Sequence, residues 1–330
     1  MELTREQVLL PLATELREIL RCAACKAELR EESDGYRCLG CARLFPGVRG
    51  LVRFVEAESY TESFGYQWQQ YSQTQLDRTD RDLSENDFCA KTKFTAEELN
   101  GKLVLDVGCG MGRFAEVATR WGARVVGIDL STAVEVAARN LTQREFVGYQ
   151  ADLFQLPFAP ESFDVIYSIG VLHHTPDCEK AFKILPQYLK PGGTLAVWLY
   201  SGYNKWYRFS DQYRKITHRM SIRRLHSLLR IVVPPLYYLD KGLRKVHGIG
   251  RPLASFLHNV FPVSRHPEPQ TRMLDTLDWY SPKYQSKHTY EEVFRWFESC
   301  GLEGLTVGHI PLAMRGRKPF REGTGPSRIW

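Results

Sequence analysis

The chain has 330 residues, of which 43% are hydrophobic and 25% are charged, and its formal net charge is +6. This balance is ordinary for a globular protein and excludes a chain dominated by disorder, while the length allows one large or two modest hydrophobic cores. The first six residues contain no apolar run, and the longest apolar stretch, residues 231–239, spans nine residues that include two prolines. We therefore expect neither a signal peptide nor a membrane span.

Four of the eight cysteines stand in two close pairs near the start of the chain. Cys22 and Cys25 form one C-x2-C pair, Cys38 and Cys41 form the second, and twelve residues separate the pairs. An Asp-Gly dipeptide in the middle of that spacer is a hairpin turn signal, so local chain reversal would bring the four thiolates together. Four thiolates at tetrahedral geometry bind zinc and leave no open position for a catalytic water. We predict a structural zinc site, which implies a reducing compartment, and we place the protein in the cytoplasm.

The sequence around the two cysteine pairs, residues 20–51, is similar to the Trm112-like zinc ribbons. We accordingly expect an N-terminal helix and zinc ribbon over residues 1–55. A polar connector follows over residues 56–100, and its residues 63–71 (SFGYQWQQY) are dense in aromatic and amide side chains. These aromatics either pack the connector onto the next domain or form a lid over a ligand bound there, because flat rings bury a large area in both roles.

Residues 104–112 (VLDVGCGMG) and the run that ends at Asp129 are the most informative part of the chain. The first run predicts a buried strand, a tight turn on three glycines, and a helix that starts at about Phe114. Asp129 stands seventeen residues past the last glycine, at the end of the next strand, where an acid can accept both hydroxyls of a ribose. The glycine order is G-x-G-x-G, without the G-x-G-x-x-G cradle for a pyrophosphate, so NAD is disfavoured.

Three further strand-like runs follow in order, over residues 146–153, 163–168 and 189–198, the last after a Pro-Gly-Gly turn. Stretches of about a dozen residues with helical patterning separate them, which indicates βαβ units and a mainly parallel sheet. We predict an α/β fold with a Rossmann-like, doubly wound sheet over residues 101–201.

In order and register these four motifs resemble the class I S-adenosylmethionine (SAM) methyltransferases, in their ubiquinone-methylase-like, type 11 branch. The resemblance implies a SAM-dependent enzyme in which the glycine turn lies against the amino-acid part of the cofactor. It also gives the ribbon a context, since Trm112-like modules accompany methyltransferases as separate activators or as fused domains. In this family the segment before the first strand often folds over the cofactor, as the lid interpretation requires.

The resemblance implies a set of cofactor-binding residues, each at the end of a strand. Gly108, Gly110 and Gly112 would line the amino-acid part of SAM, Asp106 would reach its ammonium group, and Asp129 would bind the ribose. For the remaining positions, adenine would contact Leu130, Asp152 and the Leu153 amide, and the ammonium group would meet the backbone carbonyls of Ile169 and Gly170.

Two adjacent histidines, His173 and His174, follow the fourth strand at the carboxyl edge of the sheet, where doubly wound folds bind ligands. Histidine titrates near neutrality and can take a proton from a hydroxyl or amine. We name both as candidate catalytic bases; the alternative is that they only hydrogen-bond the backbone of their loop. His288, near aromatic residues 279, 280 and 284, is a second candidate.

Residues 202–280 hold fourteen Lys and Arg against five Asp and Glu, a net charge of +9. Six of the basic residues recur at roughly helical spacing among apolar ones: Arg214, Lys215, Arg219, Arg223, Arg224 and Arg230. One interpretation is an amphipathic helical cap with a basic polar face. The other is an anion-binding face for a phosphorylated, carrier-bound or nucleic-acid substrate, or for a membrane surface.

After this basic insert, residues 289–297 predict a helix with Gly301 past its end, and residues 302–307 and 312–315 predict two strands. These elements, within residues 281–330, match the end of the methyltransferase fold. The resemblance therefore places the insert between the fifth strand and its following helix, where this superfamily commonly builds substrate pockets.

We expect a cytoplasmic SAM-dependent methyltransferase that modifies an oxygen, nitrogen or carbon atom of a small or carrier-linked metabolite, which the basic insert suggests is anionic. The nearest alternative is an RNA methyltransferase, because a zinc ribbon and a basic, aromatic-bearing insert also suit RNA. Against it, residues 168–171 read Ser-Ile-Gly-Val where base-methylating enzymes carry an Asn-Pro-Pro-Tyr-type tetrapeptide. A third alternative is a non-catalytic SAM-binding scaffold whose ribbon docks a partner enzyme. The sequence leaves the acceptor atom and the oligomeric state open.

Overall fold

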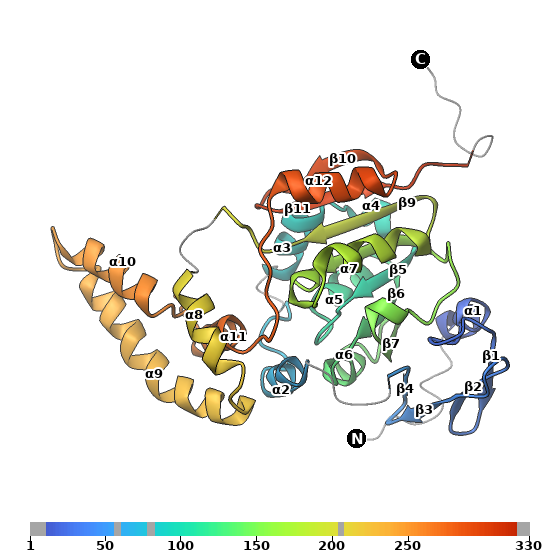
Figure 1. The fold of residues 1–330 in the computed structure, drawn as a ribbon, viewed down its shortest axis with the longest axis horizontal. Helices are drawn as coiled ribbons and strands as arrows, with labels where there is room; N and C mark the ends of the chain where they lie inside the picture. Colours follow the sequence, from blue (N-terminus) through green and yellow to red (C-terminus); the bar gives the residue numbers. More distant parts are fainter. Residues whose placement is uncertain (1–10, 56–60, 78–82, 204–207, 322–330) are drawn as a thin grey trace, which may run out of the picture.

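The computed structural model describes residues 11–55, 61–77, 83–203 and 208–321. Within these ranges eleven strands form one sheet, shown in Figure 1. The strands are β1 (Leu29–Glu32), β2 (Gly35–Cys38), β3 (Leu44–Val48), β4 (Leu51–Arg53), β5 (Leu103–Val107), β6 (Arg124–Asp129), β7 (Phe146–Gln150), β8 (Phe163–Ile169), β9 (Leu189–Trp198), β10 (Glu303–Val307) and β11 (Ala313–Arg317). Their order in the sheet is β1-β2-β3-β4-β7-β6-β5-β8-β9-β11-β10.

The middle of the sheet is parallel, which confirms the predicted α/β, Rossmann-like fold. Strands β4, β7, β6, β5, β8 and β9 pair in parallel, whereas β11 and β10 at one edge and β3, β2 and β1 at the other pair antiparallel with their neighbours. The order reverses at β5, where one crossover leads to β6 on one side and a later one to β8 on the other. Such a reversal point is where open α/β sheets bind ligands at the carboxyl ends of their strands.

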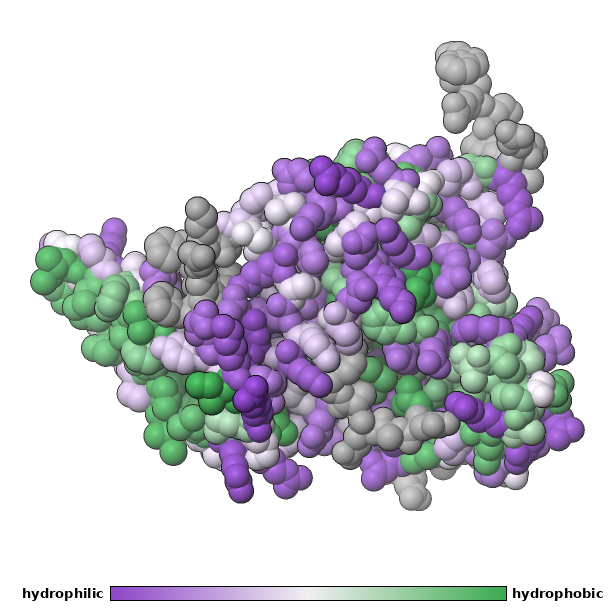
Figure 2. All heavy atoms as spheres, viewed as in Figure 1, coloured by the Kyte–Doolittle hydropathy of each residue, from purple (hydrophilic) through white to green (hydrophobic). Residues whose placement is uncertain are grey.

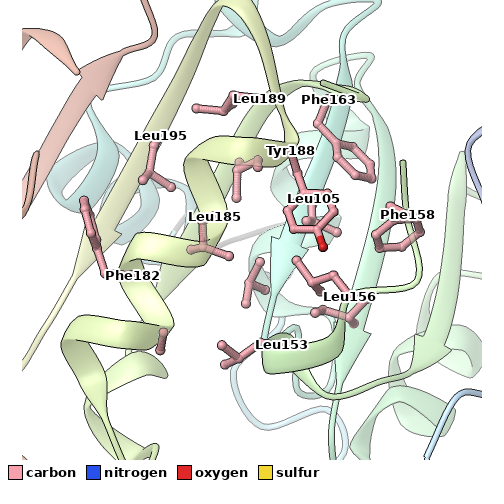
Figure 3. Packing of buried hydrophobic residues seen from close by; sticks show 14 of the residues in the cluster. Leu105, Leu153, Leu156, Phe158, Phe163, Phe182, Leu185, Tyr188, Leu189 and Leu195 are labelled. Atoms are coloured by element: carbon pink, nitrogen blue, oxygen red, sulfur yellow. The ribbon is translucent and has the colours of Figure 1, made fainter. Parts of the chain in front are cut away.

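Two layers of helices cover the two faces of this sheet (Figure 1). Side chains of a strand alternate between the faces, so Leu105 and Val107 join one hydrophobic cluster and Val104 the other. Figure 3 shows the first cluster, in which β5 and β8 pack against the helix that ends at Ile184 and the turn after it. The core helices and short 3-10 turns are α1 (Pro11–Ile19), α2 (Glu62–Gln70), α3 (Leu83–Thr92), α4 (Ala96–Leu99), α5 (Arg113–Arg120), α6 (Ala133–Asn140), η2 (Leu153–Gln155), η3 (Leu172–His174), α7 (Cys178–Ile184), η4 (Leu185–Tyr188) and α12 (Tyr290–Ser299).

The N-terminal ribbon is part of the same sheet rather than a separate body. Strand β4 pairs in parallel with β7, and Phe45 and Phe54 pack with Tyr149 in the first hydrophobic cluster. The Lys26 ammonium donates to the carbonyl oxygen of Leu156 at 2.8 Å. The hairpin turn falls one residue earlier than the Asp-Gly signal suggests, because β1 and β2 pair up to Glu32 and Gly35, leaving residues 33–34 as the turn.

The basic insert is helical, as predicted, and projects from one end of the core (Figure 1). Its helices are α8 (Arg208–Thr217), α9 (Ile222–Leu243), α10 (Gly250–Val260) and α11 (Pro269–Tyr280). Their inner faces form a small hydrophobic cluster of their own, and the Tyr66 and Tyr71 hydroxyls of the connector lie 3.0 and 2.8 Å from the two ring nitrogens of His226 on α9. These contacts join the connector to the insert.

The last elements of the core also follow the prediction. Helix α12 begins with a capping box in which the Thr289 side chain accepts from the Glu292 amide and the Glu292 carboxylate accepts from the Thr289 amide. Strand β11 then inserts beside β9 and completes the sheet. No helix in the described parts of the chain combines the length and the apolar character that a membrane crossing needs.

Candidate cofactor and acceptor site

A cavity of about 340 Å³ lies at the carboxyl ends of β5, β6 and β8, where the strand order reverses. This volume falls in the range of small-molecule sites. Eight of the ten residues predicted to bind the cofactor line it: Gly108, Gly110, Asp129, Leu130, Asp152, Leu153, Ile169 and Gly170. The sequence motifs, which are up to 62 residues apart, thus meet at one place.

The glycine turn after β5 is held against the end of β6 by its own backbone. The amides of Gly108 and Cys109 both donate to the carbonyl oxygen of Ile128, at 2.8 and 2.9 Å. Gly110 has a left-handed φ of 53°, and a Cβ atom there would lie 3.1 Å from the Trp68 indole nitrogen. Glycine avoids both the strain and the crowding. The turn therefore presents bare backbone to the cavity.

Asp129 is fixed at the cavity wall by three hydrogen bonds. Its Oδ2 accepts from the Gly110 amide at 3.0 Å, and its Oδ1 accepts from the Ser131 amide and hydroxyl at 2.8 and 2.7 Å. Burial raises the pKa of this carboxyl above its usual value, and the bonds from Ser131 and Gly110 oppose that rise. A carboxylate has about four acceptor sites, so one remains for a ligand, and the Ser131 hydroxyl can turn away to release a second.

Two of the predicted cofactor residues, Asp106 and Gly112, do not line the cavity. Asp106 is 2% exposed, accepts a hydrogen bond from the Tyr167 hydroxyl at 3.1 Å, and burial raises its pKa to about 8. Gly112 is the N-cap of α5 and packs toward Ala137 on α6. Both therefore support the glycine turn from behind. The sequence pattern could not separate wall from support, because Asp106 lies inside β5 and Gly112 caps α5, at the two ends of a turn whose middle faces the cavity.

The aromatic segment of the connector forms helix α2 and one wall of the cavity. Phe64, Gln67 and Trp68 line the cavity, and Gly65 approaches α6 so closely that a Cβ atom would lie 2.8 Å from the Thr132 hydroxyl oxygen. This is the position that the lid interpretation requires. Two stretches of the predicted connector, residues 56–60 at its start and 78–82 in its middle, lie outside the described residues.

The two candidate bases are placed differently, although both are buried. His174 lines the cavity, and its Nδ1 atom lies 3.0 Å from the carbonyl oxygen of Tyr284. Because a carbonyl can only accept, the proton of the neutral ring is on Nδ1, and Nε2 is the acceptor. Burial lowers the pKa of His174 below its usual value, and the Asp278 carboxylate and the Tyr284 carbonyl oppose that change.

His173 does not line the cavity. Its ring stacks on Tyr200 with the centroids 3.9 Å apart, and within the described chain neither ring nitrogen has a hydrogen-bond partner. Burial lowers the pKa of His173 well below its usual value. The histidine pair therefore offers one base to the cavity, His174, with His173 packed behind it.

The wall opposite the glycine turn is built from residues that the sequence analysis did not connect with a site. Trp198 and Tyr200 come from the end of β9, and the Tyr200 hydroxyl donates to the Asp278 carboxylate of α11 at 2.8 Å. The Asp275 carboxyl on the same helix is half-buried, which raises its pKa, and it accepts from the Ser264 hydroxyl at 2.9 Å. No local motif marks these aspartates, because the fold alone brings α11 to the sheet.

Two cations also reach the cavity, and both are paired with the same acid. Lys91 and Arg113 lie 2.7 and 3.1 Å from the Asp87 carboxylate, and the Lys91 ammonium lies 4.1 Å from the ring centre of Trp198. Burial lowers the pKa of both groups below their usual values, and Asp87 opposes that change. Arg113 stands directly after the glycine motif and was missed because α5 was expected to begin one residue later.

Other predicted site residues lie elsewhere. His288 lies 2.7 Å from the Ser286 hydroxyl and 3.5 Å from the Glu292 carboxylate, outside the cavity. None of the six basic residues singled out in the insert lines the cavity either. The insert instead contributes acidic and apolar side chains from α11, so an anion-binding role of these six basic residues would have to lie outside this cavity.

The four paired cysteines come together in the ribbon. Their sulfur atoms all lie within 4.8 Å of one another, with 3.7 Å between Cys22 and Cys41 and 3.4 Å between Cys25 and Cys38. Zn–S bonds of about 2.3 Å at tetrahedral angles place sulfur atoms about 3.8 Å apart. The amides of Gly40 and Cys41 point at the Cys38 sulfur at 3.3 Å, as thiolate ligands require. The cluster therefore fits zinc.

Comparisons with known proteins point to the same class of enzyme as the motifs that line the cavity. Residues 105–197 match the family model described as a methyltransferase domain. The chain is 38% identical over 100 residues to a ubiquinone biosynthesis O-methyltransferase of Coxiella burnetii, covering 29% of this chain and 43% of that protein. It is 30% identical over 158 residues to the sterol 24-C-methyltransferase of Saccharomyces cerevisiae, covering 46% of this chain and 39% of that protein. The chain thus spans less than half the length of these curated relatives.

A similar solved structure is an S-adenosylmethionine-dependent methyltransferase from Mesorhizobium loti, with 31% identity over 35% of this chain and 52% of that chain, and a TM-score of 0.31. Fold, cavity and family match define the class of the central region. It is a class I SAM-dependent methyltransferase domain, as the sequence resemblance implies.

Proposed function

We propose that the protein uses this domain to transfer the methyl group of SAM to an oxygen, nitrogen or carbon atom of a small or carrier-linked metabolite. The observation that carries the proposal is the shape of the cavity. One side is built from the predicted cofactor-binding residues, and the other from Trp198, Tyr200 and α11, none of which belongs to that set. A site with a second, independently built wall suits a bimolecular transfer.

In this arrangement the Asp129 carboxylate holds the ribose hydroxyls, and the bare backbone of Gly108 and Gly110 lies along the amino-acid part of SAM. Asp152 and Leu153 line the cavity just past the end of β7 and would contact adenine. Asp106 and Gly112 position the turn without contacting the cofactor. Arg113 is a further candidate, because it is a cation at the start of α5 beside the glycine turn and can meet the cofactor's carboxylate.

When bound, SAM supplies a methyl group on a positively charged sulfur atom. The protein's task is to hold the acceptor atom about 3 Å from that carbon, in line and dry, since positioning alone can supply most of the acceleration. Phe64, Trp68 and Trp198 line the cavity, and their apolar surface would keep water from the methyl group. For a hydroxyl or amine acceptor, His174 Nε2 takes the proton as the new bond forms, and the electron pair of the broken carbon–sulfur bond stays on sulfur.

The wall built from Trp198, Tyr200 and α11, which we call the acceptor wall, favours an acceptor group that donates hydrogen bonds. Asp275 and Asp278 place carboxylates in the cavity, and Tyr200 and Trp279 add aromatic surface. A phosphate group beside these carboxylates would meet like charge, which disfavours a nucleic-acid backbone inside the cavity. An anionic carrier would therefore lie outside it while the reacting hydroxyl or amine enters.

The ribbon is assigned a structural zinc ion held by Cys22, Cys25, Cys38 and Cys41. The support is the sulfur geometry together with the backbone amides aimed at Cys38. With four protein ligands the ion has no open position, so it would hold the hairpin and the strand edge beside β7 rather than act on substrate.

Calorimetric titration of SAM into Asp129→Ala tests the proposed function. Each lost bond to a charged acceptor is worth roughly 1.5–3 kcal/mol, so we expect SAM affinity to fall well over tenfold. Because Asp129 also accepts from Gly110 and Ser131, the matched control is Ser131→Ala, which keeps the carboxylate and should bind SAM within a few fold of wild type. Unchanged SAM affinity in folded Asp129→Ala protein would sink the assignment.

A further inference from the structure

Helix α9 exposes a continuous apolar stripe. Leu228, Ile231, Val232, Tyr238 and Leu239 stand at positions i, i+3, i+4, i+10 and i+11, which fall on one face of an α-helix. All five are exposed, Ile231 by 74%. Figure 2 shows hydrophobic side chains gathered over this end of the molecule.

Helix α10, which returns beside α9, continues the pattern. Ile249, Leu253 and Phe256 are spaced by four and three residues, and Ile249 is 76% and Phe256 66% exposed. Of the seventeen large hydrophobic side chains exposed within the described residues, ten lie between residues 228 and 261. Such a concentration on one element marks an interaction site rather than scattered surface residues.

The stripe is not needed to hold the insert together. The adjoining face of α9, with Leu225, Leu229 and Val233, is already buried in a cluster with Leu277 and Tyr280 of α11. The exposed side chains therefore belong to a second apolar face, which has no partner within the described residues.

The charges around this face have one sign. Residues 222–261 carry seven Lys and Arg and a single acid, Asp240. That acid is buried and bonded to Arg244 at 2.9 Å and to Arg265 at 3.0 Å, so no exposed carboxylate stands on the hairpin. Its net charge of +6 equals that of the whole chain.

We propose that the α9–α10 hairpin, residues 222–261, docks on the surface of an anionic lipid bilayer. A helix with an apolar face flanked by Lys and Arg lies in the plane of the interface, its apolar side chains among the acyl chains and its cations at the anionic headgroups. Arg223, Arg224 and Arg230 occupy the exposed surface next to the α9 stripe. The attachment is peripheral, and the hairpin does not cross the bilayer.

Two other occupants fit less well. A second copy of the chain, meeting this face with its own, would bring two surfaces of net charge +6 together without an exposed acid on either. A nucleic acid would match the cations but would leave Ile231, Ile249 and Phe256 in water. Only a surface that is both apolar and anionic satisfies the two features at once.

Docking would also set the position of the acceptor wall. Helix α11 packs on α9, and the Arg272 guanidinium lies 3.6 Å from the ring centre of Tyr237. The same helix carries Leu274, Asp275, Asp278 and Trp279 into the cavity. The hairpin thus attaches to the bilayer the part of the molecule that builds the acceptor side. The inference is independent of methyl transfer, because vesicle binding needs no acceptor.

Flotation of the full-length protein with vesicles tests it. We expect binding to vesicles of phosphatidylcholine with phosphatidylglycerol, little binding to phosphatidylcholine alone, and weakening as salt rises. Ile249→Ser with Phe256→Ser should lower binding more than tenfold. Gln at Arg223, Arg224 and Arg230 should lower it on the order of a hundredfold at low salt, about fivefold per charge.

Matched controls come from α12, which has an exposed aromatic, Phe294 at 44%, beside an exposed arginine, Arg295. Phe294→Ser and Arg295→Gln should leave vesicle binding within twofold, and every variant should keep its SAM affinity, which shows that the core is folded. Several results would overturn the proposal: no binding of wild type to anionic vesicles at low salt, equal loss in the controls, or a dimer or an oligonucleotide complex that needs the same side chains while vesicles are ignored.

Discussion

The α/β core and the helical insert treat their apolar side chains in opposite ways. All five side chains of β5 are buried, and the binding residues of the core turn inward to one cavity. The α9–α10 hairpin buries one apolar face and leaves a second in water, ringed by cations. The difference indicates that the core binds ligands that enter its cavity, whereas the insert presents an apolar face with cations to the outside of the molecule. The net positive charge of the insert does not describe the cavity, because the insert residues that line the cavity include Asp275 and Asp278.

The largest effect we expect is the unfolding of the ribbon while the core stays folded. Freshly purified protein should carry about one zinc per chain, and Cys38→Ser should release the metal and unfold the ribbon, because a structural zinc supplies much of a small module's folding free energy. The melting temperature should fall as well, since the packing of Phe45 on Phe54 and of Phe54 on Tyr149 would be lost. Metal analysis and calorimetry measure these changes.

SAM affinity should persist in Cys38→Ser, because none of the described ribbon residues lines the cavity. Cys89→Ser, a half-buried cysteine outside the cluster, is the matched control and should keep its zinc. Absence of zinc from intact wild-type protein would remove the metal assignment.

The second effect concerns the chemistry inside the core. With a hydroxyl or amine acceptor, His174→Ala should reduce turnover by roughly 10²–10⁴ and leave SAM affinity unchanged, as loss of a general base does. His288→Ala, outside the cavity, is the comparison variant and should stay within a few fold of wild type. Equal turnover in His174→Ala and wild type would mean that the acceptor needs no base from this residue.

The pH profile sharpens the same point. Burial lowers the pKa of His174 below its usual value of 6.5, so the neutral, proton-accepting form predominates at neutral pH. Turnover should therefore rise with pH only below about 6.5 and be flat above it. A rising limb centred above pH 7 would assign the base to another group.

The smallest effect we expect comes from removing positive charges on the exposed surface of the insert. Arg219, Arg223 and Arg224 do not line the cavity, so their joint replacement by Gln should leave SAM affinity and methylation of a soluble acceptor nearly unchanged. If the substrate were RNA, each lost phosphate contact would flatten the slope of log affinity against log salt by roughly 0.7 to 0.9. Tight, salt-steep RNA binding in wild type, lost in the variant together with RNA methylation, would favour the RNA alternative.

The sequence predicted the core almost strand by strand, because buried strands, glycine turns and a strand-end acid are local patterns with fixed spacing. It could not predict that α11 supplies Asp275 and Asp278, since their role depends on how an insert folds back over the sheet. The same limit explains the basic residues: helical spacing in the sequence showed a charged face, but only packing shows which way that face points. His173 and His174 are neighbours with identical chemistry, and the backbone of η3 alone decides which one reaches the cavity.

Titration calorimetry of the wild-type protein with SAM and, separately, with NAD tests the central claim most directly. The cavity predicts one SAM site per chain and no heat from NAD, because the turn of Gly108, Gly110 and Gly112 lacks the G-x-G-x-x-G spacing that cradles a pyrophosphate. Binding of NAD, or no binding of SAM by folded protein, would contradict the account.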